Sequence, residues 1–406
     1  MTFDYSRVFR SGLPPAESRW SGFPKYNFVG GHNDGASVPV EDFINASARV
    51  LQREGATLAT YSLESGSQGY FPLRKFLAAY LAKTNGMQDS AENILLVSGS
   101  LQALDLVNDV LLSKGDTVII EEAAYQGAIQ RIKRLGVEII GAPLDSGGIR
   151  TDILSNILDE LKGKGVQPKY LYTVPTVQNP TGTVMPEERR LEFLNLSRKF
   201  EVPILEDDCY ADLTFDGRRP RAIRALDDDG RVIFCGTFSK TIAPALRVGY
   251  VVADWEILSQ MLSMKRDGGS GALEQMVLGE YCPTHFEQHV IKLRDTLNEK
   301  CQVMLETIEA EFGTSADVRK PAGGIFLWVQ LPDSVDTTKL FEIAITEGVA
   351  INPGAEWVVD AETGKNKIRL CFGLPSKNQI REGVAALADI CHREFGVPER
   401  GSNLPR

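Results

Sequence analysis

Short apolar runs alternate with helical segments through the middle of the chain, and this alternation restricts the fold more than any other feature. The runs are nearly continuous in Val, Ile and Leu, which is typical of strands buried on both faces. They lie at residues 94–97, 118–120, 137–140, 170–174, 202–205, 232–235 and 248–252, with helical segments at 101–112, 125–135, 151–161 and 187–200. We therefore expect an α/β fold whose mostly parallel sheet is covered by helices on both faces.

The segments on either side of this pattern predict two further units. At 406 residues the chain is too long for one small core. Residues 1–45 are rich in Gly, Pro and aromatic side chains, which favours an irregular N-terminal arm. Strands and helices mix again after residue 295, including a helical segment at 289–312 that leads away from the sheet. We expect an arm (1–45), a large α/β domain (46–294) and a small C-terminal α+β domain (295–406).

Composition excludes several classes of protein. The net charge of −10 disfavours a nucleic-acid partner, which requires a basic face. There is no apolar run long enough to span a membrane, and the N-terminus lacks the order of a signal peptide, so we expect a cytoplasmic protein. The six cysteines show no Cys-x-x-Cys spacing and there are four histidines, so we expect neither a metal site nor a disulfide framework.

Polar clusters follow four of the predicted strands. They are 98–100, 179–182, 206–210 and 236–240. In a sheet of this kind, ligands bind beyond the carboxyl ends of the strands. Structural loops are also polar, but they would not be expected to combine a helix start, an amide, a carboxylate and a lysine. The sequence therefore predicts one binding site at this edge of the sheet.

Lys240 is the candidate catalytic residue of this site. A lysine whose surroundings lower its pKa can condense with a carbonyl group as a Schiff base. Thr237, Ser239 and Arg247 offer hydrogen-bond donors suited to a phosphate group. An isolated Ser-Lys pair would more often lie at the surface, so the prediction depends on these neighbours. Together they predict pyridoxal 5'-phosphate as the cofactor.

Two other clusters suit the same cofactor. Ser100, Leu101 and Gln102 begin a helix directly after a strand, where free N–H groups favour an anion, although Ser100 alone could be a simple N-cap. Asp207 at a strand end could keep a pyridine nitrogen protonated, and its alternative is a turn or cap residue.

The remaining candidates would contact the ring or the substrate. Asn179 and Tyr210 suit the phenolic oxygen of the ring, and Tyr125 has a flat face for stacking, although a tyrosine there is more often simple packing. Arg369 lies on an otherwise apolar strand. It could bind a substrate carboxylate through two hydrogen bonds, or lie in solvent on an edge strand.

Taken together, these residues resemble the class I and II aminotransferases of the fold-type I pyridoxal-phosphate enzymes. The resemblance covers residues 28–395 and is closest to the branch with 2-aminoadipate and broad-specificity aromatic or branched-chain aminotransferases. The segments that carry it are 239–250, 179–182, Asp207 with Tyr210, 323–328 and 368–370.

The resemblance implies a role for each candidate. Lys240 would form the internal aldimine and move the proton, Asp207 would pair with the pyridinium, and Asn179 and Tyr210 would contact the ring oxygen. Tyr125 would stack on the ring and Arg369 would bind the substrate carboxylate. The phosphate would be held by Ser100, Leu101, Gln102, Thr237, Ser239 and Arg247. Members of this family are homodimers, and Tyr61 matches the tyrosine that reaches the phosphate of the partner subunit.

The segment 30–34 departs from the family pattern, because Gly30-Gly31-His32-Asn33-Asp34 replaces the usual Gly-Leu-Pro. This segment lies close to the substrate in relatives, so Gly31 and His32 are candidates for substrate contact. A single histidine is as often a packing residue, but a functional His32 would be an added acid or base.

The leading hypothesis is an aminotransferase that moves the amino group of an L-amino acid to a 2-oxo acid. A second hypothesis is another pyridoxal-phosphate reaction, such as oxidation of an amino acid by dioxygen with the help of His32. A third is an effector-binding module of a transcription regulator, although the short lead-in is not expected to hold a DNA-binding domain. The sequence does not identify the amino acid.

Overall fold

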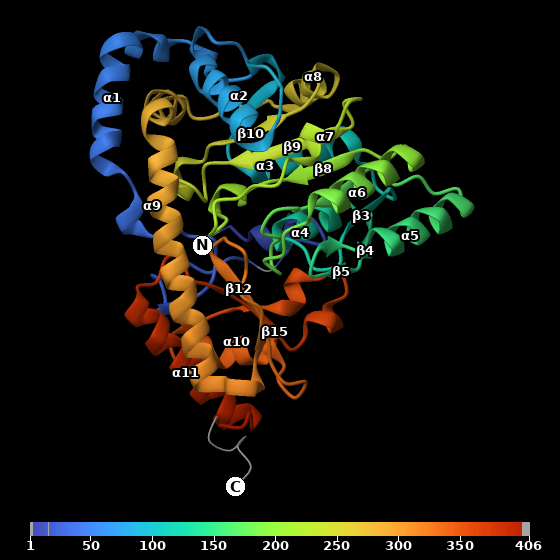
Figure 1. The fold of residues 1–406 in the computed structure, drawn as a ribbon, viewed down its shortest axis with the longest axis vertical. Helices are drawn as coiled ribbons and strands as arrows, with labels where there is room; N and C mark the ends of the chain where they lie inside the picture. The colour runs from blue at the N-terminus through green and yellow to red at the C-terminus, as the bar shows by residue number, and fades with distance from the viewer. Residues whose placement is uncertain (1–2, 15, 400–406) are drawn as a thin grey trace.

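A seven-stranded sheet is the largest sheet of the computed structural model, which describes residues 3–14 and 16–399 (Figure 1). Its order is β2-β10-β9-β8-β7-β3-β4, and only β10 runs antiparallel to its neighbours. The strands are β2 (Ile94–Val97), β3 (Thr117–Glu121), β4 (Glu138–Ala142), β7 (Leu171–Thr173), β8 (Ile204–Asp207), β9 (Val232–Thr237) and β10 (Gly249–Val252). Each corresponds to one of the apolar runs, and the predicted fold class is confirmed.

Helices cover both faces of this sheet. Leu205 of β8 packs in one core cluster with α3 (Ser100–Leu111), α4 (Gln126–Arg134) and α8 (Trp255–Met264). Its neighbour Ile204 packs in another cluster with α5 (Thr151–Gly163) and α6 (Glu187–Phe200). Successive strand residues point to opposite faces, so a strand between two helical layers must be apolar throughout.

The other end of the sheet, at β2 and β10, is covered by a separate group of helices. Ile94 and Val252 pack there with α1 (Val40–Glu54), α2 (Phe71–Asn85) and the first part of α9 (Ala272–Phe312). α9 also packs against α11 (Lys377–Phe395), so this helix touches both regions of the molecule.

The C-terminal region contains a four-stranded antiparallel sheet. Its order is β11 (Asp317–Val318), β12 (Phe326–Gln330), β15 (Lys367–Cys371) and β14 (Asn352–Pro353). The helices α10 (Thr337–Thr346) and α11 pack on it in one apolar cluster. β13 (Val349–Ala350) pairs in parallel with β1 (Tyr26–Asn27), which ties the N-terminal segment to this region.

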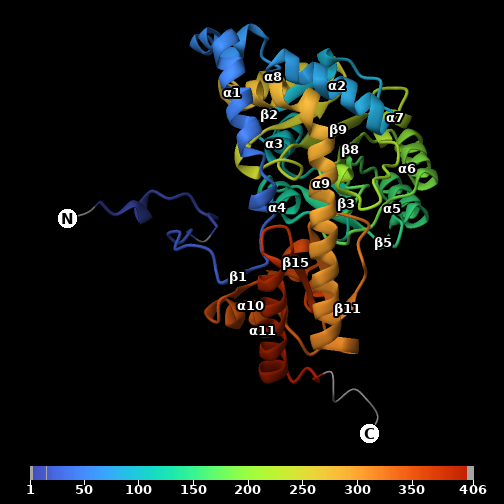
Figure 2. The same cartoon turned by 60° about the vertical axis from the view of Figure 1, so that its left-hand side comes forward.

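α9 is a single helix of 41 residues and, at 1.5 Å per residue, about 60 Å long (Figures 1 and 2). The sequence predicted only its second part, from residue 289, because Pro283 interrupts the helical pattern before that point. The boundary predicted at residue 295 falls inside this helix.

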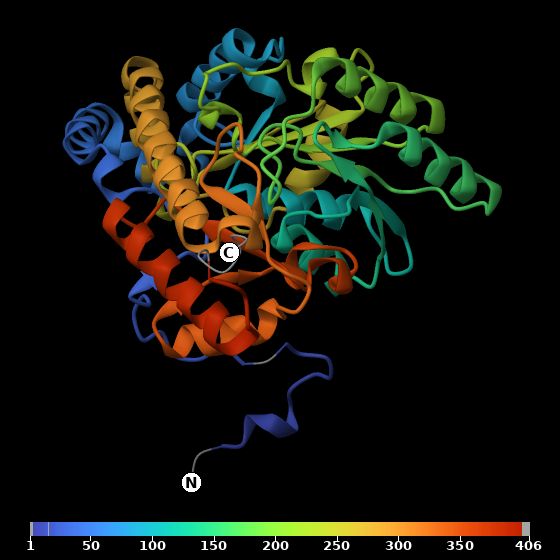
Figure 3. The ribbon, with the colours of Figure 1, turned by 60° about the horizontal axis from the view of Figure 1, so that its bottom comes forward.

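The N-terminal segment before β1 projects away from the rest of the molecule (Figures 2 and 3). Its large apolar side chains are exposed, among them Phe3, Tyr5, Phe9 and Trp20. Other features that the sequence did not predict include a short hairpin of β5 (Leu144–Asp145) and β6 (Gly148–Ile149). None of the helices in the described residues has the length and apolar character needed to cross a membrane.

Candidate active site

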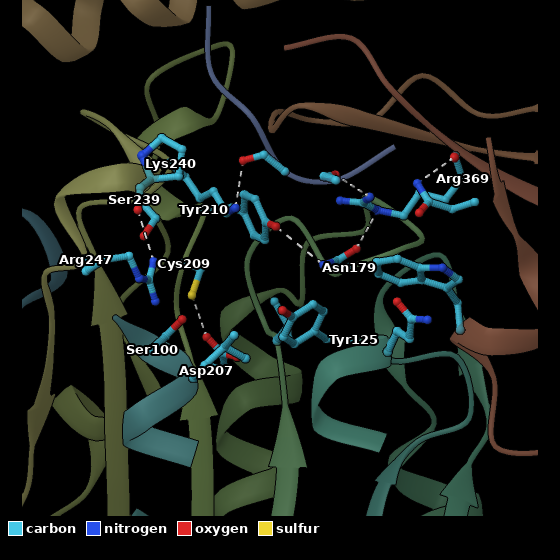
Figure 4. Close-up of a pocket in the computed structure, with 18 residues that line it drawn as sticks. Ser100, Tyr125, Asn179, Asp207, Cys209, Tyr210, Ser239, Lys240, Arg247 and Arg369 are labelled. Carbon is cyan, nitrogen blue, oxygen red and sulfur yellow. Dashed lines mark hydrogen bonds between the residues drawn. The ribbon is translucent and has the colours of Figure 1, made fainter. Parts of the chain in front are cut away.

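A cavity of about 230 Å³ lies at the carboxyl ends of the parallel strands, where the sequence predicted a site (Figure 4). Because β10 runs antiparallel, its start lies at the same edge and brings Arg247 there. The residues lining the cavity are Gly30, Gly31, Ser100, Leu101, Tyr125, Gln126, Val174, Asn179, Asp207, Cys209, Tyr210, Ser239, Lys240, Pro244, Arg247, Asn352, Trp357 and Arg369. The structure thus brings most of the predicted site residues together.

Lys240 lies just beyond the end of β9, with its amine in the cavity. Nζ donates a hydrogen bond of 2.9 Å to the carbonyl oxygen of Gly31. Burial lowers the pKa of Lys240 below its usual range, and the charges of Arg369 and Arg247 lower it further against the opposing effect of two nearby cysteines. A Cβ atom on Gly31 would lie 2.4 Å from Nζ, so the amine occupies space that only glycine leaves open.

The other side of the cavity is built for an anion. Ser100 opens α3 directly after Gly99, so the N-terminal N–H groups of this helix lie at the cavity. Arg247 donates to the carbonyl oxygens of Ser98 and Pro244, at 3.0 Å each. A Cβ atom on Gly99 would lie 2.2 Å from Nη2 of Arg247, so the guanidinium packs directly over this glycine.

Asp207 is the buried carboxylate of the site. Its Oδ2 accepts a hydrogen bond of 2.9 Å from the hydroxyl of Tyr172, and its Oδ1 accepts one of 2.7 Å from the thiol of Cys209. Burial raises the pKa of Asp207, while these two hydrogen bonds and the charge of Lys240 act in the opposite direction. Tyr172 and Cys209 were missed, although Cys209 stands only two residues further along the chain.

Arg369 lies on β15 and is buried, so the alternative of an exposed edge-strand arginine is wrong. Its Nε donates to Oδ1 of Asn179 and its Nη1 donates to the carbonyl oxygen of Gly30, both at 2.9 Å. The guanidinium lies 4.3 Å from the ring centre of Phe326 and 4.4 Å from that of Trp357. In the described part of the chain, no acceptor takes a hydrogen bond from Nη2, which leaves it available to a ligand.

Asn179 also connects Arg369 to Tyr210, because its Nδ2 donates to the tyrosine hydroxyl at 3.4 Å. Tyr125 precedes α4 and lies 6.1 Å from Trp357, ring centre to ring centre. Figure 4 shows Arg247 and Ser239 at one end of the cavity, Arg369 at the other, and Lys240 and Tyr210 between them.

Two predicted phosphate contacts do not line the cavity with their side chains. Gln102 turns back: its Oε1 accepts from the backbone N–H of Ser98 at 2.8 Å and its Nε2 donates to Asp267 at 2.6 Å. Thr237 donates to Oγ of Ser239 at 2.9 Å, so it orients a lining residue. Their side chains therefore support the cavity wall, and contact of their backbone with a ligand stays a prediction.

His32 and Tyr61 also lie outside the cavity lining. His32 is half-buried, and its ring packs edge-to-face with Phe23 at 5.5 Å between centres. Burial lowers its pKa, and the charge of Lys240 lowers it further. Tyr61 is 87% exposed and lies beside Gly268. In this chain Tyr61 lines a separate cavity with Leu58 and Asp267, and it does not reach the active-site cavity.

Trp357 and Asn352 line the cavity but were missed by the sequence analysis. Asn352 is paired with Arg369 across β14 and β15. Knowing the register of these two strands would therefore have placed Asn352 at the site. Trp357 is placed by backbone contacts, because its carbonyl oxygen accepts from the N–H of Ala124 at 2.9 Å. That contact joins segments distant in the sequence and has no local signal.

With the geometry established, comparison with known proteins identifies the family. The family model described as aminotransferase class I and II matches residues 25–387. The chain belongs to the class I and II aminotransferases. It is 32% identical over 372 residues to aromatic-amino-acid aminotransferase 1 of Thermococcus litoralis, covering 91% of this chain and 88% of that protein.

Two solved structures extend the comparison. Kynurenine aminotransferase of Pyrococcus horikoshii, in complex with PMP, is 33% identical and superposes with a TM-score of 0.88, covering 97% of this chain and 98% of that chain. The α-aminoadipate aminotransferase of Thermus thermophilus, complexed with N-(5'-phosphopyridoxyl)-L-leucine, is 32% identical with a TM-score of 0.82, covering 89% of this chain and 91% of that chain. The predicted resemblance, enzyme class and cofactor are confirmed: this aminotransferase uses pyridoxal 5'-phosphate.

The cavity of this aminotransferase fits that cofactor chemically. A phosphate group requires hydrogen-bond donors that favour an anion. The N–H groups at the start of α3 and the guanidinium of Arg247, which packs against Gly99, provide them. A pyridine nitrogen requires a carboxylate, and Asp207 is the one at the cavity wall. A carbonyl group requires an uncharged amine, which the lowered pKa of Lys240 favours.

Proposed function

We propose that this aminotransferase moves the amino group of an L-amino acid to a 2-oxo acid, with Lys240 as the proton-transferring base and Arg369 as the binding group for the substrate carboxylate. The observation that supports these roles best is that the Lys240 amine and the Arg369 guanidinium open into one cavity. Each is held by a carbonyl oxygen of the same segment, Gly31 for Lys240 and Gly30 for Arg369.

The residues of this chain divide the remaining work. When bound, pyridoxal phosphate supplies an electron-accepting ring that stabilises negative charge at the substrate α-carbon. Asp207 would hold the ring nitrogen and Asn179 with Tyr210 the ring oxygen, while Tyr125 would lie on the ring face. The phosphate would be held by Ser100, Ser239, Arg247 and the backbone at Leu101 and Gln102, with Thr237 orienting Ser239.

We infer that the preferred amino acid carries an uncharged side chain. Of the described residues that line the cavity, the basic ones are Lys240, Arg247 and Arg369. All three have roles with the cofactor or the α-carboxylate, so no cation remains for a second carboxylate. The names of two relatives, an aromatic-amino-acid aminotransferase and a kynurenine aminotransferase, support a large side chain.

The test is a screen of amino acids with a 2-oxo acid acceptor, with formation of the new 2-oxo acid as the measured product and Lys240→Ala as the blank. We expect turnover with neutral amino acids, less with aspartate and glutamate, and none in the variant. Turnover by Lys240→Ala at the wild-type rate would overturn the assignment of the base.

Oxidation by dioxygen is the second candidate, because His32 lies beside the segment that touches Lys240. Its ring is close to Gly30, where a Cβ atom would lie 2.7 Å from Nε2. An oxidase would consume oxygen and release ammonia from the amino acid with no 2-oxo acid acceptor present. We expect neither product above background, and the same result in His32→Phe, because the ring packs on Phe23 and does not line the cavity.

We propose further that two chains form a homodimer in which Tyr61 contributes to the site of the partner subunit. Tyr61 is 87% exposed in the single chain, so its ring and hydroxyl are free to contact a second subunit. The apolar side chains of the projecting N-terminal segment, such as Phe9 and Trp20, would be covered in the same way.

A further inference from the structure

Glu121 is a fully buried carboxylate at the carboxyl end of β3, next to the active-site cavity but outside its lining. Its hydrogen-bond partners are a hydroxyl, a backbone N–H and an amide, and none of them is positively charged. Burying a carboxylate without a cation costs free energy unless donors satisfy it. Such a group persists where its hydrogen bonds fix a particular arrangement.

The three donors come from the neighbouring strand and the loop that follows it. Oε1 of Glu121 accepts from the hydroxyl of Thr173 at 2.7 Å and from the N–H of Val174 at 3.1 Å, while Oε2 accepts from Nε2 of Gln178 at 2.8 Å. Burial raises the pKa of Glu121, and the three donors favour its ionised form and act against that rise. The carboxylate therefore joins the ends of β3 and β7 to the loop at residues 178–183.

Gln178 is held on both sides of its amide. Nε2 also donates to the carbonyl oxygen of Ala123 at 2.7 Å, and Oε1 accepts from the N–H and the hydroxyl of Thr181 at 2.8 and 2.7 Å. The next residue is Asn179, whose Oδ1 accepts from Nε of Arg369 at 2.9 Å. A continuous path thus leads from the buried carboxylate to the guanidinium.

We propose that Glu121 is a positioning residue for substrate-carboxylate binding: it fixes Gln178, which sets the place of Asn179 and so the direction of the Arg369 guanidinium. The inference rests on the proposed function, in which Arg369 binds the carboxylate. Glu121 itself touches neither substrate nor cofactor, so its effect is confined to how well the site distinguishes a carboxylate from an uncharged group.

The experiment compares two unreactive probes on the holoenzyme by isothermal titration calorimetry. One is 3-phenylpropionate, and the other is 3-phenylpropan-1-ol, which has a hydroxymethyl group in place of the carboxylate. In Glu121→Gln the new NH₂ group faces donors, so we expect the preference for the carboxylate probe to fall about tenfold. A purely structural loss would weaken both probes equally. In steady-state assays KM for the amino acid should rise more than kcat falls.

Two further variants make the comparison specific. Glu206→Gln removes the charge of another fully buried glutamate, whose donors are the N–H groups of Ile223 and Arg224, and it should keep the carboxylate preference. If Glu121→Gln does not fold, Gln178→Leu breaks the contact from the other side.

The outcomes separate the inference from the function on which it rests. If the wild type does not distinguish the two probes, the proposed role of Arg369 is wrong. If the wild type prefers the carboxylate and Glu121→Gln, or its substitute Gln178→Leu, keeps that preference, the role of Glu121 is wrong.

Discussion

Gly30 and Gly31 present consecutive carbonyl oxygens to the two basic side chains on which the proposed reaction depends. Gly31 accepts from Lys240 and Gly30 accepts from Arg369, so a single peptide segment sets the direction of both side chains. The thiol of Cys371 also donates to the Gly30 oxygen, at 2.8 Å. Substitutions in this segment should therefore lower kcat more than they lower the free energy of unfolding.

Gly31→Ala should lower kcat without unfolding the protein. The new Cβ atom would lie 2.4 Å from Nζ of Lys240, and the end of a lysine side chain can move aside. Displacing a catalytic group by about 1 Å can cost roughly 100-fold in rate. The matched control is Gly35→Ala, where no atom lies within 4 Å of the added methyl group. Equal kcat values for the two variants would contradict the assigned position of the amine.

The amine of Lys240 should lose its proton at a lower pH than a surface lysine. Burial lowers the pKa of Lys240, whereas the hydrogen bond to Glu160 raises that of Lys164. Because only the uncharged amine reacts with acetic anhydride, labelling of the cofactor-free protein should begin at lower pH for Lys240. Peptide mapping across a pH series measures both residues in one sample. A later onset at Lys240 would refute the lowered pKa.

At the scale of elements, the site depends on where strands and helices begin and end. The start of α3, the end of β8 and the antiparallel entry of β10 meet at one edge of the sheet. Gly99 is where the backbone before α3 packs directly against the guanidinium of Arg247. Its φ of +81° is also one that favours glycine.

Gly99→Ala should weaken cofactor binding more than backbone strain alone explains. The added Cβ atom would lie 2.2 Å from Nη2 of Arg247, so the guanidinium must leave the anion site. Losing one hydrogen bond between a guanidinium and a phosphate corresponds to roughly a tenfold or larger rise in Kd. Gly115→Ala is the control, because Gly115 has a similar φ of +89° and no atom within 4 Å of the new methyl group. Equilibrium dialysis with pyridoxal phosphate would show equal Kd values if the prediction is wrong.

The sequence predicted elements better than contacts between them. Buried strands give continuous apolar runs, so all seven strands of the central sheet were found. The first part of α9 was missed because glycines precede it and Pro283 lies inside it. Arg369 was found because a charge stands out on an apolar strand. Trp357 and Tyr172 were missed because their contacts with the site are made across distant segments.

At the scale of the whole molecule, we propose that the chain divides into the arm 1–45, the large domain 46–294 and the small domain 295–406. The active-site cavity takes Lys240 from the large unit, Arg369 from the small one and Gly31 from the arm. The site is therefore complete only when all three are packed together.

Tyr61→Phe should weaken cofactor binding in the dimer. If the Tyr61 hydroxyl donates to the phosphate in the partner subunit, its loss should raise the Kd about tenfold. Since Tyr61 is 87% exposed in the single chain, folding should not change. Sedimentation velocity would establish the dimer, and dialysis would give the Kd. A dimeric variant with the wild-type Kd would exclude the contact.

α9 runs through both of the proposed larger units and packs against helices of each. It packs against α1 and α2 beside the central sheet and against α11 beside the smaller sheet, and its backbone is helical throughout. A helix is stiff along its length, and Pro283 is the one described residue within it that cannot donate a backbone hydrogen bond. If the small unit moves toward the large one when a substrate binds, either the small unit must rotate about the axis of α9 or the helix must bend near Pro283. The mechanical stiffness of one helix thus sets which movements the two halves of the site can make.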